Sequence, residues 1–168
     1  AGGVRYDIST NMSKFEGSLH INGSARLMSN VTDMKKLTLT LGDGASMRHY
    51  QGGSSNNVAA ALHVGALADA AGYSSFKAKP TFGGSDESWF VGYNNTDATF
   101  SCKLIAKSVT KVGTGNWTIK GNENSSSITV KEGKLTIFNL SGSATTGTLT
   151  IAKGATLAGS GTTNSLVA

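Results

Sequence analysis

ITVKEGKLTI at residues 128–137 and LTIAKGATL at residues 149–157 are two copies of one unit in this sequence. Each copy begins with alternating apolar residues, reaches a glycine, and continues with a second short apolar run. The glycines of the two copies, Gly133 and Gly154, are 21 residues apart. A fixed period of about 20–50 residues is typical of architectures built from stacked repeats.

Similar units occur along the rest of the chain. The LTLTL run at Leu37–Leu41 leads into a glycine-rich corner, and Gly23 and Gly44 are again 21 residues apart. Short alternating strands separated by Gly, Asn, Ser and Asp indicate β-structure. We therefore predict an all-β fold, a parallel β-solenoid with about 21 residues per rung, forming a single domain over residues 1–168. Each rung then buries its apolar side chains inside the coil and pairs with the rungs above and below.

A β-sandwich is the alternative fold. The hairpins of a sandwich commonly use Asn-Gly or Asp-Gly turns, and Asn22-Gly23 and Asp43-Gly44 fit that description. The equal glycine intervals and the Thr-rich, charge-poor strands favour the solenoid over the sandwich.

The best helical candidate is NVAAALHVGALADAA at residues 57–71. Its alanines favour a helix. Gly65 interrupts the apolar pattern, however, and the segment can equally form a strand with a small-residue turn.

Glycine and hydroxyl residues dominate the composition. The 168 residues include 22 Gly and 1 Pro, and charged residues make up 15% of the chain, against roughly 25% in an average soluble domain. The surface is therefore expected to be rich in Ser, Thr and Asn. Hydrophobic residues make up 38% of the chain and alternate in short runs, which argues against disorder.

The formal net charge of +5 raises the question of nucleic acid as a partner. The 12 Lys and 3 Arg are scattered, and the nearest approaches to clusters are Lys35-Lys36 and Lys77-Ala-Lys79. Phosphate-binding faces usually show denser clusters. We therefore expect no nucleic-acid partner, and we expect single lysines to protect strand edges from unwanted pairing.

Four segments together resemble the autotransporter-associated β-strand repeats of bacterial surface proteins. They occur in the order of that family's pattern: FVGYNNTDATFS at 90–101, VTKVGTGNWTI at 109–119, ITVKEGKLTI at 128–137 and LTIAKGATLAGSGT at 149–162. Residues 90–162 thus carry the clearest family-like repeats. The chain departs from the pattern at Cys102 and at residues 122–127, and residues 1–89 match it only through generic strand–glycine units.

The resemblance implies a right-handed parallel β-helix that is exported through a Gram-negative envelope and is extracellular or displayed on the outer-membrane surface. It implies neither catalytic residues nor a cofactor, because that family is defined by its scaffold repeats. The implied function is structural or adhesive. The surface partner is then a host or microbial glycan or protein.

The chain is expected to be part of a longer protein. It starts at Ala1 without Met, shows no signal peptide, and has no apolar stretch near the roughly 18 residues of a transmembrane segment. Ser165–Ala168 reads as the opening strand of another rung, and no charged residue follows Lys153 to cap it. We therefore expect the last rung to be frayed or to be covered by another molecule. A second copy of the chain, stacked end to end, is one such molecule.

Parallel β-helices also house polysaccharide lyases and hydrolases, whose sites need clustered carboxylates. The 10 acidic residues are dispersed, and only Asp86 and Glu87 are adjacent. Neighbours on a strand point to opposite faces, so a solvated loop is favoured over a catalytic or metal-binding pair.

Cys102, the only cysteine, is expected to be buried and inert. Three separated histidines show no zinc-ligand spacing: His20, His49 and His63.

Aromatic residues gather in one segment of the chain: Phe76, Phe82, Trp89, Phe90, Tyr93 and Phe100. Core filling is the favoured interpretation. The alternative is a glycan-binding surface on Trp89 and Tyr93, because strand alternation can place Trp89, Val91 and Tyr93 on one face. A carbohydrate-binding solenoid is therefore the alternative function, followed by a polysaccharide lyase or hydrolase.

Overall fold

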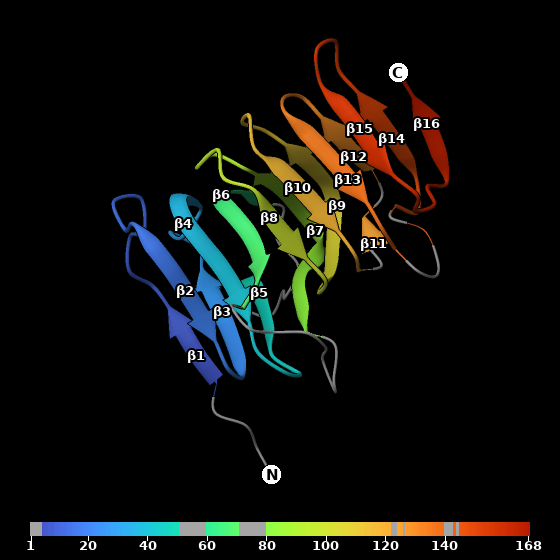
Figure 1. Cartoon of the computed structure of the whole chain (residues 1–168). Coiled ribbons are helices and arrows are strands. Elements are labelled where there is room, and N and C mark those ends of the chain that lie inside the picture. Colours follow the sequence, from blue (N-terminus) through green and yellow to red (C-terminus); the bar gives the residue numbers. More distant parts are fainter. Residues whose placement is uncertain are drawn as a thin grey trace.

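The computed structural model describes residues 5–50, 60–70, 80–121, 124–125, 127–139, 143 and 145–168. Within them every regular element is a strand, and the strands stack in one direction from the N-terminal to the C-terminal end (Figure 1). No helix among these residues could span a bilayer. The strands are β1 (Arg5–Ile8), β2 (Gly17–Ile21), β3 (Ser24–Met28), β4 (Asp33–Leu41), β5 (Ser46–Tyr50), β6 (Ala60–Asp69), β7 (Thr81–Val91), β8 (Ala98–Phe100), β9 (Lys103–Lys111), β10 (Asn116–Ile119), β11 (Asn124–Ser125), β12 (Ser127–Val130), β13 (Lys134–Ile137), β14 (Thr148–Ile151), β15 (Thr156–Gly159) and β16 (Ser165–Val167).

Successive strands wind around three faces. The first face holds β1, β3, β5, β11 and the N-terminal parts of β7 and β9. The second face holds β12, β14, β16, the N-terminal parts of β4 and β6, and the C-terminal parts of β7 and β9. The third face holds β2, β8, β10, β13, β15 and the C-terminal parts of β4 and β6. The long strands therefore bend at corners and serve two faces each.

The strand pairs recorded among the described residues are parallel, and the stack has about six turns spaced roughly 21 residues apart. Ile128, for example, pairs with Leu149 in the next rung. The predicted parallel β-solenoid is confirmed. The β-sandwich alternative is wrong, because Asn22-Gly23 and Asp43-Gly44 form corners between faces and not hairpins.

The two glycine intervals that predicted the period belong to different corners of the coil. Gly23 and Gly44 follow third-face strands and lead into the first face, whereas Gly133 and Gly154 follow second-face strands and lead into the third. All four have positive φ, a conformation that glycine adopts without the strain of a Cβ. The repeat is therefore marked by two columns of corner glycines.

The interior is built from columns of apolar side chains that stack from rung to rung. On the second face one column runs through register-paired, buried positions: Leu62, Trp89, Val109, Ile128 and Leu149. Neighbouring strands are about 4.8 Å apart, so each side chain contacts the one above and the one below. Full burial of such a side chain stabilises the fold by about 1.5–3 kcal/mol, and a rung gains this only beside its neighbours.

Four aromatic side chains fill the middle of the coil. Phe82 makes an edge-on contact with Trp89, with ring centroids 6.2 Å apart. Phe100 lies 5.4 Å from Phe82 and 5.7 Å from Trp117. Core filling is therefore confirmed for Phe82, Trp89 and Phe100. It is wrong for Phe90 and Tyr93, which are only half-buried and lie beside His63, while Phe76 lies outside the described residues.

A lysine occupies one position of an otherwise apolar inward column. Lys111 pairs in register with Val91 and Val130 and is buried. Its ammonium group turns to the corner and donates to the carbonyl oxygens of Val112 at 2.7 Å and Gly113 at 2.6 Å. Burial lowers the pKa of Lys111, and these carbonyl dipoles supply partners for the buried charge.

The segment that was the best helical candidate contains strand β6, so the strand interpretation is confirmed for residues 60–69. Ala70 follows the strand without regular structure, and residues 57–59 and 71 lie outside the described residues. Gly65 sits at the corner between the second and third faces, where a Cβ would come within 2.7 Å of the Leu37 carbonyl oxygen. The glycine that weakened the helical pattern is therefore the residue that the corner requires.

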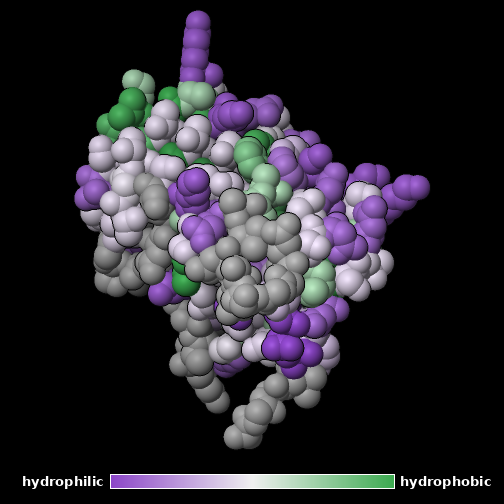
Figure 2. Space-filling view, turned by 180° about the vertical axis from the view of Figure 1, so that it is seen from behind, coloured by the Kyte–Doolittle hydropathy of each residue, from purple (hydrophilic) through white to green (hydrophobic). Residues whose placement is uncertain are grey.

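The C-terminal residues add a further strand to the second face. β16 pairs with β14 in register, as expected for the opening of another rung. Leu166 and Val167 are each 53% exposed, and Figure 2 shows hydrophobic side chains gathered at this end of the stack. Cover of this rung by end-to-end self-association stays a prediction.

Gly113 and Gly154 test how tightly the corners stack. Gly113 has a φ of +71°, and a Cβ there would overlap the Gly92 carbonyl oxygen of the neighbouring rung. Gly154 has a φ of +87° but open space around a Cβ. We expect Gly154→Ala to cost about 1–2 kcal/mol from backbone strain and Gly113→Ala to cost clearly more. Urea unfolding of both variants measures this, and equal costs would contradict tight stacking.

Candidate functional site

The fold brings together all three arginines of the chain. Arg5, Arg26 and Arg48 lie on β1, β3 and β5, which are neighbouring strands of the first face. Arg26 pairs in register with Arg48. Apolar residues beside them in the strands, such as Ala25 and Met47, are buried, so strand alternation turns the arginines outward.

A row of hydroxyl side chains runs beside the arginines along the stack. Arg5, Ser24, Ser46, Thr81 and Lys103 occupy register-paired positions on successive strands of the first face. With neighbouring strands about 4.8 Å apart, the row is about 19 Å long. A cation therefore stands at each end of the row with hydroxyl groups between.

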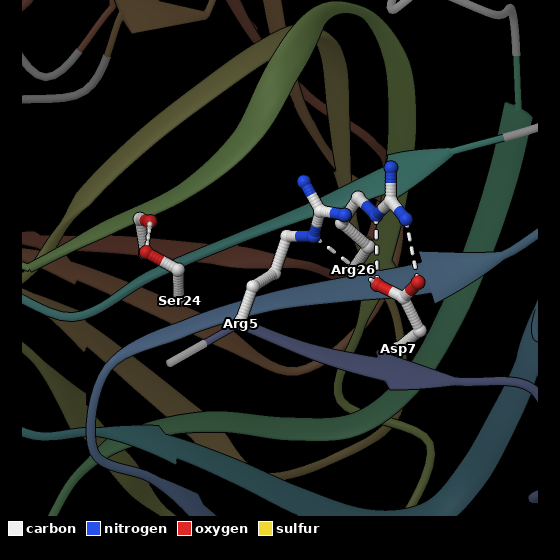
Figure 3. A network of polar contacts seen from close by, with 5 residues as sticks. Arg5, Asp7, Ser24 and Arg26 are labelled. Atoms are coloured by element: carbon white, nitrogen blue, oxygen red, sulfur yellow. Dashed lines mark hydrogen bonds and ion pairs between the residues drawn. The ribbon is translucent and has the colours of Figure 1, made fainter. Parts of the chain in front are cut away.

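Arg26 is held in place from two sides. Its Nε and Nη2 donate to the two carboxylate oxygens of Asp7 at 2.8 and 2.5 Å, and its guanidinium lies 4.0 Å from the centre of the Tyr50 ring. Figure 3 shows Arg5 and Arg26 both reaching toward Asp7. The hydrogen bond from Arg26 lowers the pKa of Asp7, so this carboxylate stays ionised and fixes the guanidinium.

Arg5 and Arg48 leave an excess of positive charge in the same hollow. Arg5 Nε is 3.5 Å from the Asp7 carboxylate, which Arg26 already engages at shorter distance. Arg48 is exposed and forms no ion pair with a carboxylate of the described residues. A hollow of about 330 Å³ lies over these side chains, and Gly83 contributes to its lining. We name this hollow, with Arg5, Arg26, Arg48 and the neighbouring hydroxyls, the arginine groove.

A buried carboxyl group lies close to the arginine groove. Glu87 is 4% exposed and accepts hydrogen bonds from the His49 backbone N–H at 2.7 Å and from the Trp89 indole N–H at 2.9 Å. Burial raises the pKa of Glu87 to about 7, although these hydrogen bonds and the charge of Arg48 oppose the shift. Near neutral pH the carboxyl is therefore partly protonated.

The structure does not bring Trp89 and Tyr93 together on a surface. Trp89 is 0% exposed, so its indole cannot stack on a sugar ring, and the glycan surface built on both residues is wrong in this respect. Alternation does place Trp89 and Val91 on one face, but that face points inward. Tyr93 lies beyond the end of β7, and its hydroxyl is 2.8 Å from Nδ1 of His63.

The other candidates are also dispersed. Asp86 and Glu87 do not form a pair, because Glu87 is buried and Asp86 is partly exposed. The described residues contain no group of three or more potential metal ligands. Cys102 is buried, as expected. The histidines occupy separate surroundings: His20 near Thr40, His49 in the interior and His63 stacked on Phe90.

Sequence reasoning missed the arginine groove because it looked for basic residues that adjoin along the chain. The available signal was the period itself. Arg5, Arg26 and Arg48 are separated by 21 and 22 residues, about one rung each. Applying the rung period to charged residues would have placed the three arginines on neighbouring rungs, although not in their exact register.

Comparisons of the chain with protein-family models, curated proteins and solved structures found no match. The autotransporter-type family of residues 90–162 therefore stays an expectation from the sequence. The function of the chain is therefore inferred from the chemistry of its own surface, where the arginine groove brings three guanidinium groups together.

The buried carboxyl predicts a pH-dependent stability. The folded chain keeps the Glu87 proton between its ordinary pKa of 4.5 and about 7, whereas the unfolded chain loses it. The free energy of unfolding therefore falls as pH rises through this window, by an amount on the order of 3 kcal/mol. Glu87→Gln should remove this contribution.

Urea unfolding from pH 4.5 to 7.5 measures the effect. The wild-type value minus the Glu87→Gln value should decrease with pH, even if the variant is less stable throughout. Asp86→Asn is the matched control, since it removes a neighbouring, less buried carboxylate. Parallel curves for wild type and Glu87→Gln would contradict the burial of an ionisable group here.

Proposed function

We propose that the chain is a non-catalytic, adhesive β-solenoid of a bacterial cell-surface or secreted protein, which attaches to surfaces through the arginine groove. The observation that carries the proposal is the groove itself. Guanidinium and hydroxyl groups from successive rungs meet on one outward face. Such groups recognise ligands by hydrogen bonding and charge.

The scaffold suits attachment because it holds these side chains on a rigid surface. The strands that carry Arg26 and Arg48 pair with neighbours on both edges. Their inward residues Ala25, Leu27 and Met47 belong to the continuous core. Groups held on such a scaffold lose little conformational entropy on binding, which favours affinity.

The carboxylates of the groove support binding over catalysis. Hydrolysis of a glycosidic bond generally uses two carboxyl groups that flank the bond on opposite sides. Asp7 is engaged by Arg26 in a two-point contact, and Glu87 is buried. Neither is placed to donate a proton to, or attack, a ligand in the groove.

The proposed location is the extracellular or outer-membrane surface of a Gram-negative bacterium. It rests on the resemblance of residues 90–162 to surface repeats. A hydroxyl-rich, weakly charged exterior suits that setting, where glycans are abundant ligands.

Binding and turnover measured side by side test the proposal. The chain is applied to surfaces coated with acidic and neutral polysaccharides, and the same polymers are incubated with it in solution. We expect retention on a polysaccharide surface without release of shortened or unsaturated products. Product formation that is lost in Asp86→Asn or Glu87→Gln would instead indicate a lyase or hydrolase.

A further inference from the structure

We propose that the arginine groove binds a linear polyanionic glycan, whose carboxylate or sulfate groups contact Arg5 and Arg48 while its hydroxyls follow the hydroxyl row. This inference rests on the adhesive function proposed above and specifies its ligand. Guanidinium groups form two-point hydrogen bonds with planar carboxylates and with other oxyanions. The groove thus has the chemistry that an acidic sugar requires.

The roles of the three arginines differ. Arg26 already forms hydrogen bonds with Asp7 and packs against the Tyr50 ring. It is therefore a fixed part of the lining of the hollow. Arg48 projects from the neighbouring strand without a described ion-pair partner, and Arg5 has 58% of its side chain exposed. These two guanidinium groups are therefore the ones available to an external anion.

The hydroxyl row sets the direction of the ligand. Ser24, Ser46 and Thr81 lie between Arg5 and Lys103 along the axis of the stack. The hydroxyls of Ser24 and Ser46 are 3.3 Å apart, and each can donate and accept hydrogen bonds. A chain that carries both hydroxyls and repeated negative charges matches this row best when it runs along the axis.

The charge balance favours an anion. Arg5, Arg48 and Lys103 are cations of the groove and its row, whereas Asp7 is the ionised carboxylate and is offset by Arg26. Burial keeps Glu87 partly neutral near pH 7, which reduces its repulsion of a bound anion. A neutral glycan would not neutralise this excess of positive charge.

The same features favour an acidic glycan over a single-stranded nucleic acid. Proteins that bind single strands without sequence preference stack bases on aromatic side chains. The described residues that line the hollow include no aromatic side chain, and Arg26 covers a face of the nearby Tyr50 ring. Hydroxyl groups, in contrast, suit the hydroxyls of a sugar chain.

Matched polymers test the ligand class. Dextran sulfate is compared with dextran, and polygalacturonate with its methyl ester, so that the two members of each pair share a backbone and differ chiefly in charge. We expect binding of both charged polymers at low salt and at least tenfold weaker binding of the neutral partners. Affinity should fall with salt, because binding releases counterions from the polyanion.

Substitutions of the groove arginines test whether the polymer binds in the groove. Arg48→Gln should weaken binding about threefold to tenfold, and Arg5→Gln combined with Arg48→Gln should weaken it further. Arg48→Lys keeps the positive charge but loses the planar guanidinium group that can form two parallel hydrogen bonds. Its affinity should therefore lie between those of wild type and Arg48→Gln. Lys153→Gln, which removes an exposed charge far along the stack, is the control and should bind as wild type. Circular dichroism confirms that each variant folds.

The outcomes separate this inference from the adhesive function. Equal binding of charged and neutral polymers overturns the polyanionic ligand, while adhesion through the groove stands. Charged-polymer binding that Lys153→Gln reduces as much as Arg48→Gln overturns the groove as the binding site and leaves only adhesion through another face of the solenoid. Absence of binding to every polymer contradicts both proposals. Tighter binding of single-stranded DNA than of dextran sulfate, lost in Arg48→Gln, would replace the glycan with nucleic acid.

Discussion

Register-matched stacking of parallel rungs is the constraint on which the rest of the structure depends. Each residue has its main neighbours at the same position one rung away, so an inward position must suit the residues above and below it. Leu62, Trp89 and Val109 satisfy this on the second face. Lys111 departs from it and is tolerated because its ammonium group reaches the carbonyl oxygens of the corner. The glycine corners follow from the same constraint, since stacked turns leave no room for a Cβ at Gly113.

Stacking also organises the exterior, because it brings polar and charged residues that are far apart in the chain onto one face. Residues that lie one rung apart in the chain become neighbours on a face, so Arg26 and Arg48 meet although 22 residues separate them. A face of this kind needs no loop to assemble a site. Its groups repeat along the axis with the strand spacing, which is why the ligand proposed for it is itself a linear polymer.

Much of the fold could be predicted from the sequence, because strand alternation and corner glycines are local signals of the rung. The burial of Trp89 could be favoured but not decided from the sequence, since alternation shows which residues share a face but not whether that face is the inner one. The arginine groove was missed for another reason: its residues adjoin only once the register is known. Arg5 pairs with Ser24 and Asp7 with Arg26, a register of 19 residues that the average period does not specify.

Disulfide trapping tests the stacking directly. In a Cys102→Ala background, Thr129→Cys and Thr150→Cys place thiols at register-paired positions of β12 and β14, at a strand spacing of about 4.8 Å that permits a disulfide. Thr129→Cys with Thr136→Cys is the control, because a corner separates β12 from β13 and the two positions lie on different faces. Under mild oxidation we expect rapid cross-linking of the first pair and none of the second. Equal cross-linking of both pairs, or of the control alone, would contradict a parallel, in-register solenoid.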